Sequence, residues 1–421
     1  MKNGIKTRML VHNILFNILK HNLNIDDEKF SRSLENYSQR DKNFIINICL
    51  TTMRRQFHIN YIISKYVKKN NKIHQKILLM SAICQIIYLN FKEYAVIDTS
   101  VEIAKQLKLY HGFINSVLKK ISKDKKYLSD IEIKYEVLPT WFRNEVDNLN
   151  KSEKNIFLSN FYKKPNLHIV FNSEIEFKKF EKKIVKTSQN SGFLQNDKIN
   201  YFNLDSFNKG TWWVQDLSSF IPINSISSTL KDKKVLDMCA APGGKSFQAI
   251  AANAKVFSND KNKKRLKILR NNLVRLNFDA KISNMDATNL NINEKFDLVI
   301  IDAPCSGIGT IRRNPEILFK SEKPNIGKLN KIQKKLLSES KKHLNRDGYI
   351  LYMVCSFLYS ETISQINSFL VENENFNLIK LTTPKMLIEH FNINDYFLTL
   401  PSNYKGYNFD GYFAALMASK N

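Results

Sequence analysis

Residues 235–245 read Val-Leu-Asp-Met-Cys-Ala-Ala-Pro-Gly-Gly-Lys, a short apolar run that leads into a turn with two adjacent glycines. Gly243 and Gly244 lack side chains, so the backbone of this turn is able to approach a ligand closely. A helix is expected after Lys245, and its N-terminus would favour an anionic group, to which Lys245 could add a charge-assisted contact. Two glycines also mark ordinary turns, so the neighbouring segments decide how this stretch is interpreted.

Strand-like and helix-like segments alternate on both sides of this turn. We predict strands at residues 234–238, 255–258, 280–283, 298–301 and 349–354, helices after Lys245 and at 263–276, and a C-terminal strand pair around 396–400 and 411–417. Such alternation predicts a mainly parallel sheet with helices on both faces. Ligands of these folds bind at the carboxyl ends of the strands. The glycine turn lies at one of those ends, and this favours a nucleoside cofactor.

Acidic residues follow the next two predicted strands. Asp260 comes roughly 20 residues beyond the turn, where a carboxylate accepts hydrogen bonds from ribose hydroxyls. Asp286 follows the third strand and is a candidate for an adenine amino group. Either residue could instead cap a helix, because Asp is a favourable N-cap. Arg265 is expected either to brace this site or to be an ordinary exposed helical arginine.

Two cysteines each follow an apolar run and precede a serine. Cys305 lies in Phe-Asp-Leu-Val-Ile-Ile-Asp-Ala-Pro-Cys-Ser-Gly (296–307), and Cys355 lies in Gly-Tyr-Ile-Leu-Tyr-Met-Val-Cys-Ser (348–356). Two thiols at strand ends beside a cofactor turn suggest covalent catalysis. By chemistry alone either thiol could attack, and the attacking one needs a nearby positive charge to lower its pKa from about 8.5. Lys245 is a candidate for that charge.

The first 125 residues contain almost no glycine or proline, and their apolar residues recur at helical spacing, which predicts a helical bundle. Cys49 and Cys84 fall on the apolar faces and are expected in the core. Pro139 marks a boundary. Beyond it we predict a charged helix at 144–162 and a strand at 167–171. Residues 210–219 hold two tryptophans, which would either stack on bases or pack between domains.

The composition indicates the class of partner. Lys and Arg exceed Asp and Glu by 65 to 39, for a formal charge of +26, and this favours a polyanion such as nucleic acid. A general bias of the sequence toward Lys, Asn and Ile would give the same charge balance without any dedicated binding surface.

Five cysteines without a Cys-x-x-Cys pair fit a reducing compartment and argue against a structural zinc site. No stretch reaches the roughly 20 apolar residues that span a bilayer, so we expect a cytoplasmic protein without metal or membrane contact.

The motifs around both cysteines carry a family resemblance. Residues 237–245, the stretch Asp-Ala-Pro-Cys-Ser-Gly-Ile-Gly-Thr-Ile-Arg-Arg-Asn-Pro-Glu (302–316) and Cys355-Ser356 resemble the signature of the Sun family of RNA cytosine-5 methyltransferases, which use S-adenosylmethionine. Residues 95–105 and 112–121 resemble the helical domain of NusB. This fusion is typical of the RsmB-type members, which methylate small-subunit (16S) ribosomal RNA.

The resemblance implies a fold, and with it a role for each site residue. The fold is multidomain α plus α/β, with a NusB-like helical RNA-binding domain (1–130), a small α+β connecting domain (131–225) and a Rossmann-like methyltransferase domain (226–421). Cys355 would be the nucleophile that adds to cytosine carbon 6, Cys305 would assist release, and Asp302 would bind the cytosine N3 edge. The implied cofactor contacts are Cys239, Ala240, Ala241, Pro242, Gly243, Gly244, Lys245, Asp260, Arg265, Asp286 and Asp302.

The expected partner is naked or partly assembled 16S rRNA, because the reactive face of the base must be reached. Arg312 and Arg313 are candidates for holding its phosphates, or else ordinary surface arginines. We expect a monomer. Two alternatives stay open, a tRNA cytosine-5 methyltransferase and a noncatalytic RNA-binding assembly factor. Three features depart from the family pattern: Val354 before the nucleophile, Ser360-Glu361-Thr362 after it, and Val170 in the strand at 167–172.

Overall fold

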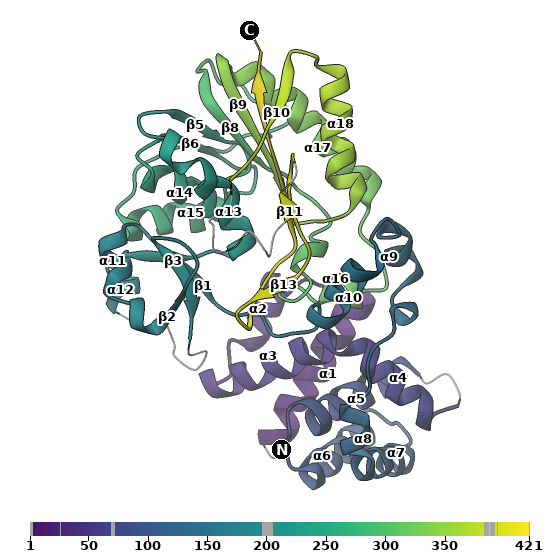
Figure 1. Ribbon diagram of the computed structural model, residues 1–421. Coiled ribbons are helices and arrows are strands. Elements are labelled where there is room, and N and C mark those ends of the chain that lie inside the picture. Colours follow the sequence, from purple (N-terminus) through teal and green to yellow (C-terminus); the bar gives the residue numbers. More distant parts are fainter. Residues whose placement is uncertain are drawn as a thin grey trace. The chain divides into compact units, whose positions relative to one another are not determined.

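The computed structural model describes residues 3–25, 27–68, 72–195, 205–382, 387, 392–393 and 395–420. These residues form two compact units (Figure 1). The first unit comprises Met1–Asn144, Phe161–Lys164 and Ile311–Pro324, and the second comprises Glu145–Asn160, Pro165–Thr310 and Asn325–Asn421. The chain therefore leaves and re-enters each unit, and the three-domain boundaries expected from sequence stay a prediction.

The first unit is helical, as predicted. Its helices are α1 (Asn3–His21), α2 (Glu28–Leu34), α3 (Gln39–Arg54), α4 (Gln56–Tyr66), α5 (Ile73–Ile83), α6 (Glu93–Gln106), α7 (His111–Lys123), α8 (Lys125–Ser129) and α9 (Thr140–Glu145). Ser38 caps α3 by accepting a hydrogen bond from the backbone N–H of Asp41. Cys49 and Cys84 are buried in the common core of these helices, which confirms the packing role expected for them.

A short segment that follows Cys305 in sequence belongs to this helical unit. Its helix α16 (Glu316–Phe319) contacts α1, and the Phe319 ring lies in the same hydrophobic core. Arg54 Nε donates a 2.6 Å hydrogen bond to the carbonyl of Arg312, and Glu316 Oε1 accepts one from the backbone N–H of Ile25. The core of the helical unit is therefore completed by residues from the second half of the chain.

The second unit contains a small antiparallel sheet with the strand order β2-β3-β1-β4. Its strands are β1 (His168–Phe171), β2 (Ile184–Lys186), β3 (Ser191–Leu194) and β4 (Trp212–Val214), with α11 (Glu174–Lys178) and α12 (Asp205–Asn208) between them. Trp212 and Trp213 are 1% and 2% exposed. Their faces are therefore not available for stacking on bases, and both side chains pack in hydrophobic cores of the second unit.

The helix predicted over residues 144–162 is wrong in extent. The structure has α10 (Lys151–Asn160), separated from the end of α9 at Glu145. Asn150 and Glu153 form a capping box, since Asn150 Oδ1 accepts from the Glu153 N–H and Glu153 Oε2 accepts from the Asn150 N–H. These reciprocal bonds begin a new helix at Lys151.

The large sheet has the strand order β11-β12-β15-β9-β8-β5-β6-β7, and β10 also pairs with β15. Its strands are β5 (Lys234–Asp237), β6 (Lys255–Asn259), β7 (Lys281–Ser283), β8 (Phe296–Asp302), β9 (Leu344–Val354), β10 (Phe376–Ile379), β11 (Asn392–Ile393), β12 (Phe397–Thr399) and β15 (Tyr412–Ser419), and β13 (Ser402–Tyr404) and β14 (Tyr407–Phe409) form a separate hairpin. β5 to β9 are parallel, and β12 pairs antiparallel with β15. Every strand predicted for this sheet is present.

Helices cover both faces of the large sheet (Figure 1). Val235 and Leu298 face the core formed with α13 (Leu217–Ile226), α14 (Gly244–Ala251) and α15 (Lys263–Leu276), whereas Leu236 and Val299 face α17 (Ile326–Ser340) and α18 (Ile363–Glu372). Successive strand residues point to opposite faces, so an apolar run fills both cores. β5 lies between β6 and β8, and the strand order reverses there; ligands of such sheets bind at this switch point.

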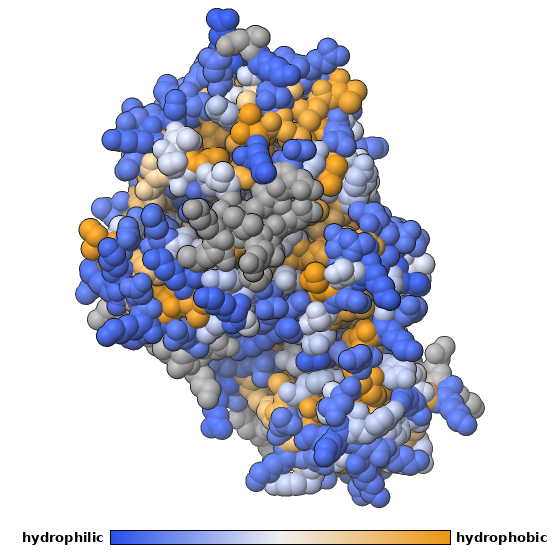
Figure 2. Space-filling model, in the orientation of Figure 1, coloured by the Kyte–Doolittle hydropathy of each residue, from blue (hydrophilic) through white to orange (hydrophobic). Residues whose placement is uncertain are grey.

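Hydrophilic side chains cover most of the face that Figure 2 displays. No helix in the described part of the chain is long and apolar enough to cross a membrane.

Candidate active site

The glycine turn joins the end of β5 at Asp237 to the start of α14 at Gly244. Gly243 has φ 122°, and a Cβ there would lie 2.1 Å from the Phe247 ring, so only glycine fits. The backbone N–H of Ala240 donates a 2.8 Å hydrogen bond to the carbonyl of Asn259, which ties the turn to the end of β6. The predicted contacts from Cys239 to Lys245 therefore lie together at the switch point.

Acidic residues lie at the carboxyl ends of the neighbouring strands. Asp260 directly follows β6, and its carboxylate accepts from the N–H groups of Ala241 (3.2 Å) and Asn262 (2.8 Å). Asn262, not Asp260, is the N-cap of α15, which removes the capping alternative for Asp260. Asp286 follows β7, is exposed, and accepts from the Thr288 N–H and hydroxyl. These hydrogen bonds hold the pKa of Asp286 below its ordinary value.

Two other predicted residues support the turn. Arg265 is exposed on α15, and its guanidinium donates to the carbonyl of Ala241, so it braces the turn from outside. Cys239 packs in the core beneath α17 and α18, and burial raises the pKa of its thiol. Neither residue has contacts that indicate a chemical step.

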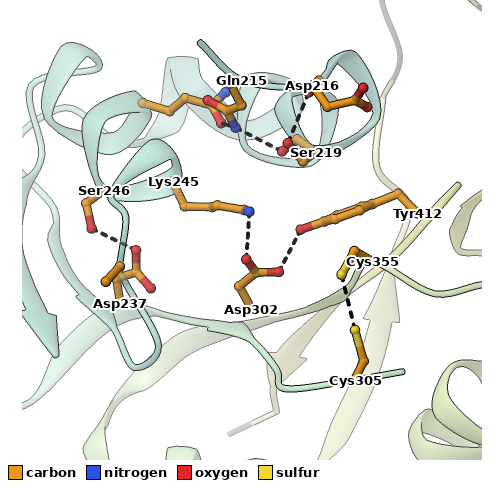
Figure 3. A network of polar contacts seen from close by, with 12 residues as sticks. Gln215, Asp216, Ser219, Asp237, Lys245, Ser246, Asp302, Cys305, Cys355 and Tyr412 are labelled. Atoms are coloured by element: carbon orange, nitrogen blue, oxygen red, sulfur yellow. Dashed lines mark hydrogen bonds and ion pairs between the residues drawn. The ribbon is translucent and has the colours of Figure 1, made fainter. Parts of the chain in front are cut away.

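Asp302, at the end of β8, is held from two sides (Figure 3). Lys245 Nζ lies 2.6 Å from Oδ2, and the Tyr412 hydroxyl donates a 2.8 Å hydrogen bond to Oδ1. Tyr412 is 2% exposed. Burial, followed by the nearby Asp302 carboxylate, raises its pKa well above the ordinary value, so the phenol is protonated at neutral pH. In this structure Lys245 is directed at the Asp302 carboxylate and not at either thiol.

Sequence reasoning missed Tyr412 as a site residue. It begins β15, which lies antiparallel to β9, and that pairing brings it beside Asp302 from 110 residues away. In the sequence, the predicted strand at 411–417 was the only indication that Tyr412 lies near the site.

The two thiols meet at the ends of β8 and β9. Cys305 Sγ lies 3.3 Å from Cys355 Sγ, and both residues are free and partly exposed (Figure 3). The Gly309 N–H donates a 3.0 Å hydrogen bond to the carbonyl of Cys355, so the two loops are also joined through their backbones. The hydrogen bond with Cys355, together with burial, raises the pKa of Cys305 well above its usual range.

A buried carboxylate lies beside the Cys305 loop. Glu361 is 0% exposed, and its oxygens accept from the Ser306 N–H (2.8 Å), the Ser306 hydroxyl (2.5 Å) and Gln333 Nε2 (3.2 Å). Gln333 Nε2 also donates to the carbonyl of Pro304, the residue before Cys305. In the sequence Glu361 stood out only as part of a departure from the family pattern.

The residues present fit a nucleoside cofactor that carries an amino acid. The turn offers backbone at the switch point, and Asp260 and Asp286 offer carboxylate acceptors at the next two strands. Asp237 is fully buried below the turn, where Ser246 donates to Oδ2 at 2.7 Å. Burial raises the pKa of Asp237 to about 7. These carboxylate acceptors suit ribose hydroxyls and amino groups, which donate.

The expectation that Arg312 contacts RNA is corrected by the structure. Its side chain is 0% exposed and its backbone carbonyl accepts a hydrogen bond from Arg54, so the surface position expected for it is wrong. Arg313 is exposed. In the described residues no group of three or more His, Cys, Asp or Glu side chains is placed to hold a metal ion.

Comparison with known proteins agrees with this geometry. Residues 227–418 match the family model described as 16S rRNA methyltransferase RsmB/F, and residues 5–123 match the NusB family. The chain belongs to the RsmB/F methyltransferase family. Family membership makes it an rRNA methyltransferase that depends on S-adenosylmethionine, with an N-terminal NusB domain.

Relatives of this RsmB/F chain match it along its length. It is 26% identical over 444 aligned positions to "Ribosomal RNA small subunit methyltransferase B" of Proteus mirabilis, covering 100% of both chains. It is 27% identical to the protein of the same name from Photorhabdus laumondii, covering 86% of this chain and 90% of the relative.

Two solved structures share the fold. The crystal structure of PH0851 matches with a TM-score of 0.71 at 19% identity, over 99% of both chains. NSun6 from Pyrococcus horikoshii, solved with SFG, matches with a TM-score of 0.54 at 18% identity, over 67% of this chain and 98% of that one.

Proposed function

We propose that this chain transfers a methyl group to carbon 5 of a cytosine in 16S rRNA through a covalent cysteine adduct. The observation that carries the proposal is the 3.3 Å contact between the Cys305 and Cys355 sulfurs, at the edge of the sheet that holds Asp302 and the glycine turn. Cytosine carbon 5 is a poor nucleophile, and a thiolate that adds to carbon 6 converts it into an enamine. The relatives' printed name supports a small-subunit rRNA substrate.

In this mechanism each side chain has one task. Cys355 Sγ adds to carbon 6, and Asp302, held by Lys245 and Tyr412, hydrogen-bonds the N3 edge of the base. S-adenosylmethionine supplies an electrophilic methyl group on its sulfonium. The carbon 5 proton then leaves, the C5–C6 double bond re-forms, and Cys305 assists expulsion of Cys355.

The cofactor contacts are proposed as follows. The turn residues Cys239, Ala240, Ala241, Pro242, Gly243, Gly244 and Lys245 would surround the amino-acid end, and Asp302 borders it. Asp260 would accept from the ribose hydroxyls and Asp286 from the adenine amino group, while Arg265 braces the turn through Ala241. Arg313, exposed on the segment after Cys305, is the proposed phosphate contact.

Asp260→Ala tests the ribose contact. We expect cofactor affinity, measured by calorimetry, to fall by about tenfold or more, since a hydrogen bond to a charged group contributes about 1.5–3 kcal/mol. RNA affinity should change much less. Asp279→Ala, an exposed carboxylate in the loop after α15, is the matched control. Unchanged cofactor affinity in Asp260→Ala would refute the ribose assignment.

The substrate state and cellular setting are also proposed. The target base must be splayed out for attack at carbon 6, so naked or partly assembled 16S rRNA suits the reaction better than a finished ribosomal subunit. We propose a cytoplasmic monomer with the NusB domain as its RNA-binding part.

One experiment tests substrate and mechanism together. The Cys305→Ala protein is incubated with total RNA and S-adenosylmethionine, resolved on a denaturing protein gel, and the retained RNA is sequenced. A retained 16S fragment that disappears in Cys305→Ala/Cys355→Ala supports the proposal and identifies the attacking thiol. A retained tRNA would favour the tRNA enzyme, and absence of methyl incorporation by the wild type would favour the noncatalytic assembly factor.

A further inference from the structure

Glu361 is a carboxylate without solvent exposure, next to a pair of thiols. Burial of an unpaired charge is costly unless hydrogen bonds compensate it, and here three donors do so: the Ser306 N–H, the Ser306 hydroxyl and Gln333 Nε2. All three belong to, or are bonded to, the loop of residues 304–306. The carboxylate is thus fixed on the Cys305 side of the thiol pair.

Glu361 links the Cys305 loop to the Cys355 loop through its side chain. Glu361 ends the short 3-10 helix Tyr359–Glu361 just after Cys355, while its side chain bonds the residue after Cys305. Ser306 Oγ also lies 3.4 Å from Ser356 Oγ, next to Cys355. The relative position of the two sulfurs therefore depends on this buried network.

The carboxylate also makes the thiol pair electrostatically unequal. A negative charge disfavours a second one nearby, and Glu361 contributes to the raised pKa of Cys305 after the Cys355 hydrogen bond, burial and the Cys355 charge. The other titratable groups around the pair are Tyr352 on β9, Tyr412 on β15, and Asp302 with its Lys245 partner. Tyr352 and Tyr412 have raised pKa values, chiefly through burial, and so are neutral.

We propose that Glu361 is a positioning residue that decides which thiol attacks: it keeps the proton of the contacting pair on Cys305, which leaves Cys355 as the nucleophile. This rests on, and deepens, the proposed covalent mechanism. Without such a residue the two thiols at 3.3 Å would be interchangeable by chemistry alone.

The same placement of the proton accounts for release. As the adduct breaks down, the carbon 5 proton passes to a solvent water, and its C–H electron pair forms the C5–C6 double bond. The C6–S electron pair returns to Cys355 Sγ, which leaves as a thiolate and accepts a hydrogen bond from the S–H of Cys305. Cys305 keeps its proton and the carbon 5 proton is lost to solvent, so no other reactant is needed.

Thiol alkylation tests the assignment without RNA. The full-length protein is treated with iodoacetamide across a pH series, and modification of each cysteine is measured by peptide mass spectrometry. In the wild type we expect the midpoint for Cys305 to lie above neutral pH, and Cys355 to be modified at least several-fold faster than Cys305 at pH 7. Buried Cys49 and Cys84 serve as internal controls for the folded state. If Cys305 reacts at the lower pH, the proposal is overturned.

Glu361→Gln isolates the charge from the hydrogen bonds. The amide oxygen is able to accept from the Ser306 N–H and Gln333, and the amide nitrogen is able to donate to Ser306 Oγ, so every contact has a counterpart. We expect the Cys305 midpoint to fall by about one pH unit. Ser306→Ala, which removes a hydroxyl and keeps the charge, should shift it by less than half as much. If Glu361→Gln folds and its Cys305 midpoint is unshifted, the proposal is contradicted. If Glu361→Gln does not fold, the order in which Cys355 and Cys305 react in the wild type decides.

The RNA reaction separates this inference from the proposed function. With substrate, Glu361→Gln should form the covalent adduct several-fold more slowly than the wild type, because the proton is no longer held on Cys305 and Cys355 is less often the thiolate. If alkylation follows the expected order but no adduct or methyl transfer occurs with RNA, the proposed function fails and the thiol assignment stands. If methyl transfer proceeds while Cys305 is the more reactive thiol, the proposed function stands and this inference fails.

Discussion

The Tyr412 hydroxyl donates a 2.8 Å hydrogen bond to Oδ1 of Asp302, from the strand that pairs with the Cys355 strand. Lys245 holds the other carboxylate oxygen at 2.6 Å. The carboxylate plane is therefore fixed by two donors from different elements.

Tyr412→Phe should slow methyl transfer without unfolding the protein. The variant deletes one hydrogen bond to a charged acceptor, a loss of about 1.5–3 kcal/mol, which corresponds to about 10- to 100-fold in kcat if the bond supports the transition state. Cofactor affinity should stay within about twofold. Steady-state kinetics with 16S rRNA and calorimetry with S-adenosylmethionine make the comparison. Tyr349→Phe, an exposed tyrosine on β9, is the control; a Tyr412→Phe enzyme as fast as that control would exclude a role for the bond.

The methyltransferase domain contains both features that the sequence predicts and site residues that it does not. The strands at 234–238 and 298–301 were predictable because their apolar runs are short, uniform and followed by turn residues, and parallel pairing then places the glycine turn and Asp302 at one edge. Tyr412 and Glu361 were not predictable as site residues. Each is a common residue whose role arises only from long-range pairing or burial, and neither effect has a local sequence signal.

The correction at Arg312 has a similar cause. A basic residue seven positions after Cys305 looks exposed when only its neighbours in sequence are considered. The segment Ile311–Pro324 instead joins the helical unit, and the Phe319 ring enters its core. The sequence does not record which of two cores an apolar residue will join.

Phe319→Ala should therefore weaken the helical unit, although residue 319 lies within the methyltransferase half of the sequence. Removal of a buried phenylalanine costs about 3–5 kcal/mol. Hydrogen exchange of peptides from α1 should speed up accordingly, while peptides from β5 and β8 should change little. Tyr94→Ala, which removes a ring that is 65% exposed on α6, is the control. Faster exchange confined to the large sheet would contradict the assignment of this segment.

Acid should destabilise the second unit partly through His168. Its ring is buried, with Nδ1 2.7 Å from the carbonyl of Gln215 and Nε2 2.8 Å from Thr187 Oγ1, and burial lowers its pKa to about 4. The unfolded chain, with a histidine pKa of about 6.5, binds a proton that the folded chain does not. The stability that neutral His168 contributes is thus complete above pH 6.5 and is lost as the pH falls toward 4, by about 1.4 kcal/mol per pH unit.

His168→Gln gives the matching measurement. The variant should be less stable than the wild type at pH 7.5, and the gap between their denaturation midpoints should narrow between pH 6.5 and 5. Intrinsic fluorescence is a suitable probe because Trp212 and Trp213 are buried beside β1. A gap that is constant over this range would show that His168 does not carry the pH dependence.

Gly309→Ala should separate the two catalytic loops. Gly309 donates its N–H to the Cys355 carbonyl at 3.0 Å and accepts from the Gly411 N–H at 2.9 Å, and a Cβ at this position would lie 2.0 Å from the Gly411 carbonyl oxygen. Since that contact is with backbone, the loop must move, and the 3.3 Å approach of the sulfurs would be lost. We expect covalent adduct formation to fall at least about 100-fold, because small misplacements of reacting groups have effects of that size.

Gly327→Ala is the control. A Cβ at residue 327, on α17, meets nothing within 4 Å, so this variant should leave activity unchanged. Equal adduct formation by the two variants would mean that contact between the loops is not needed for catalysis.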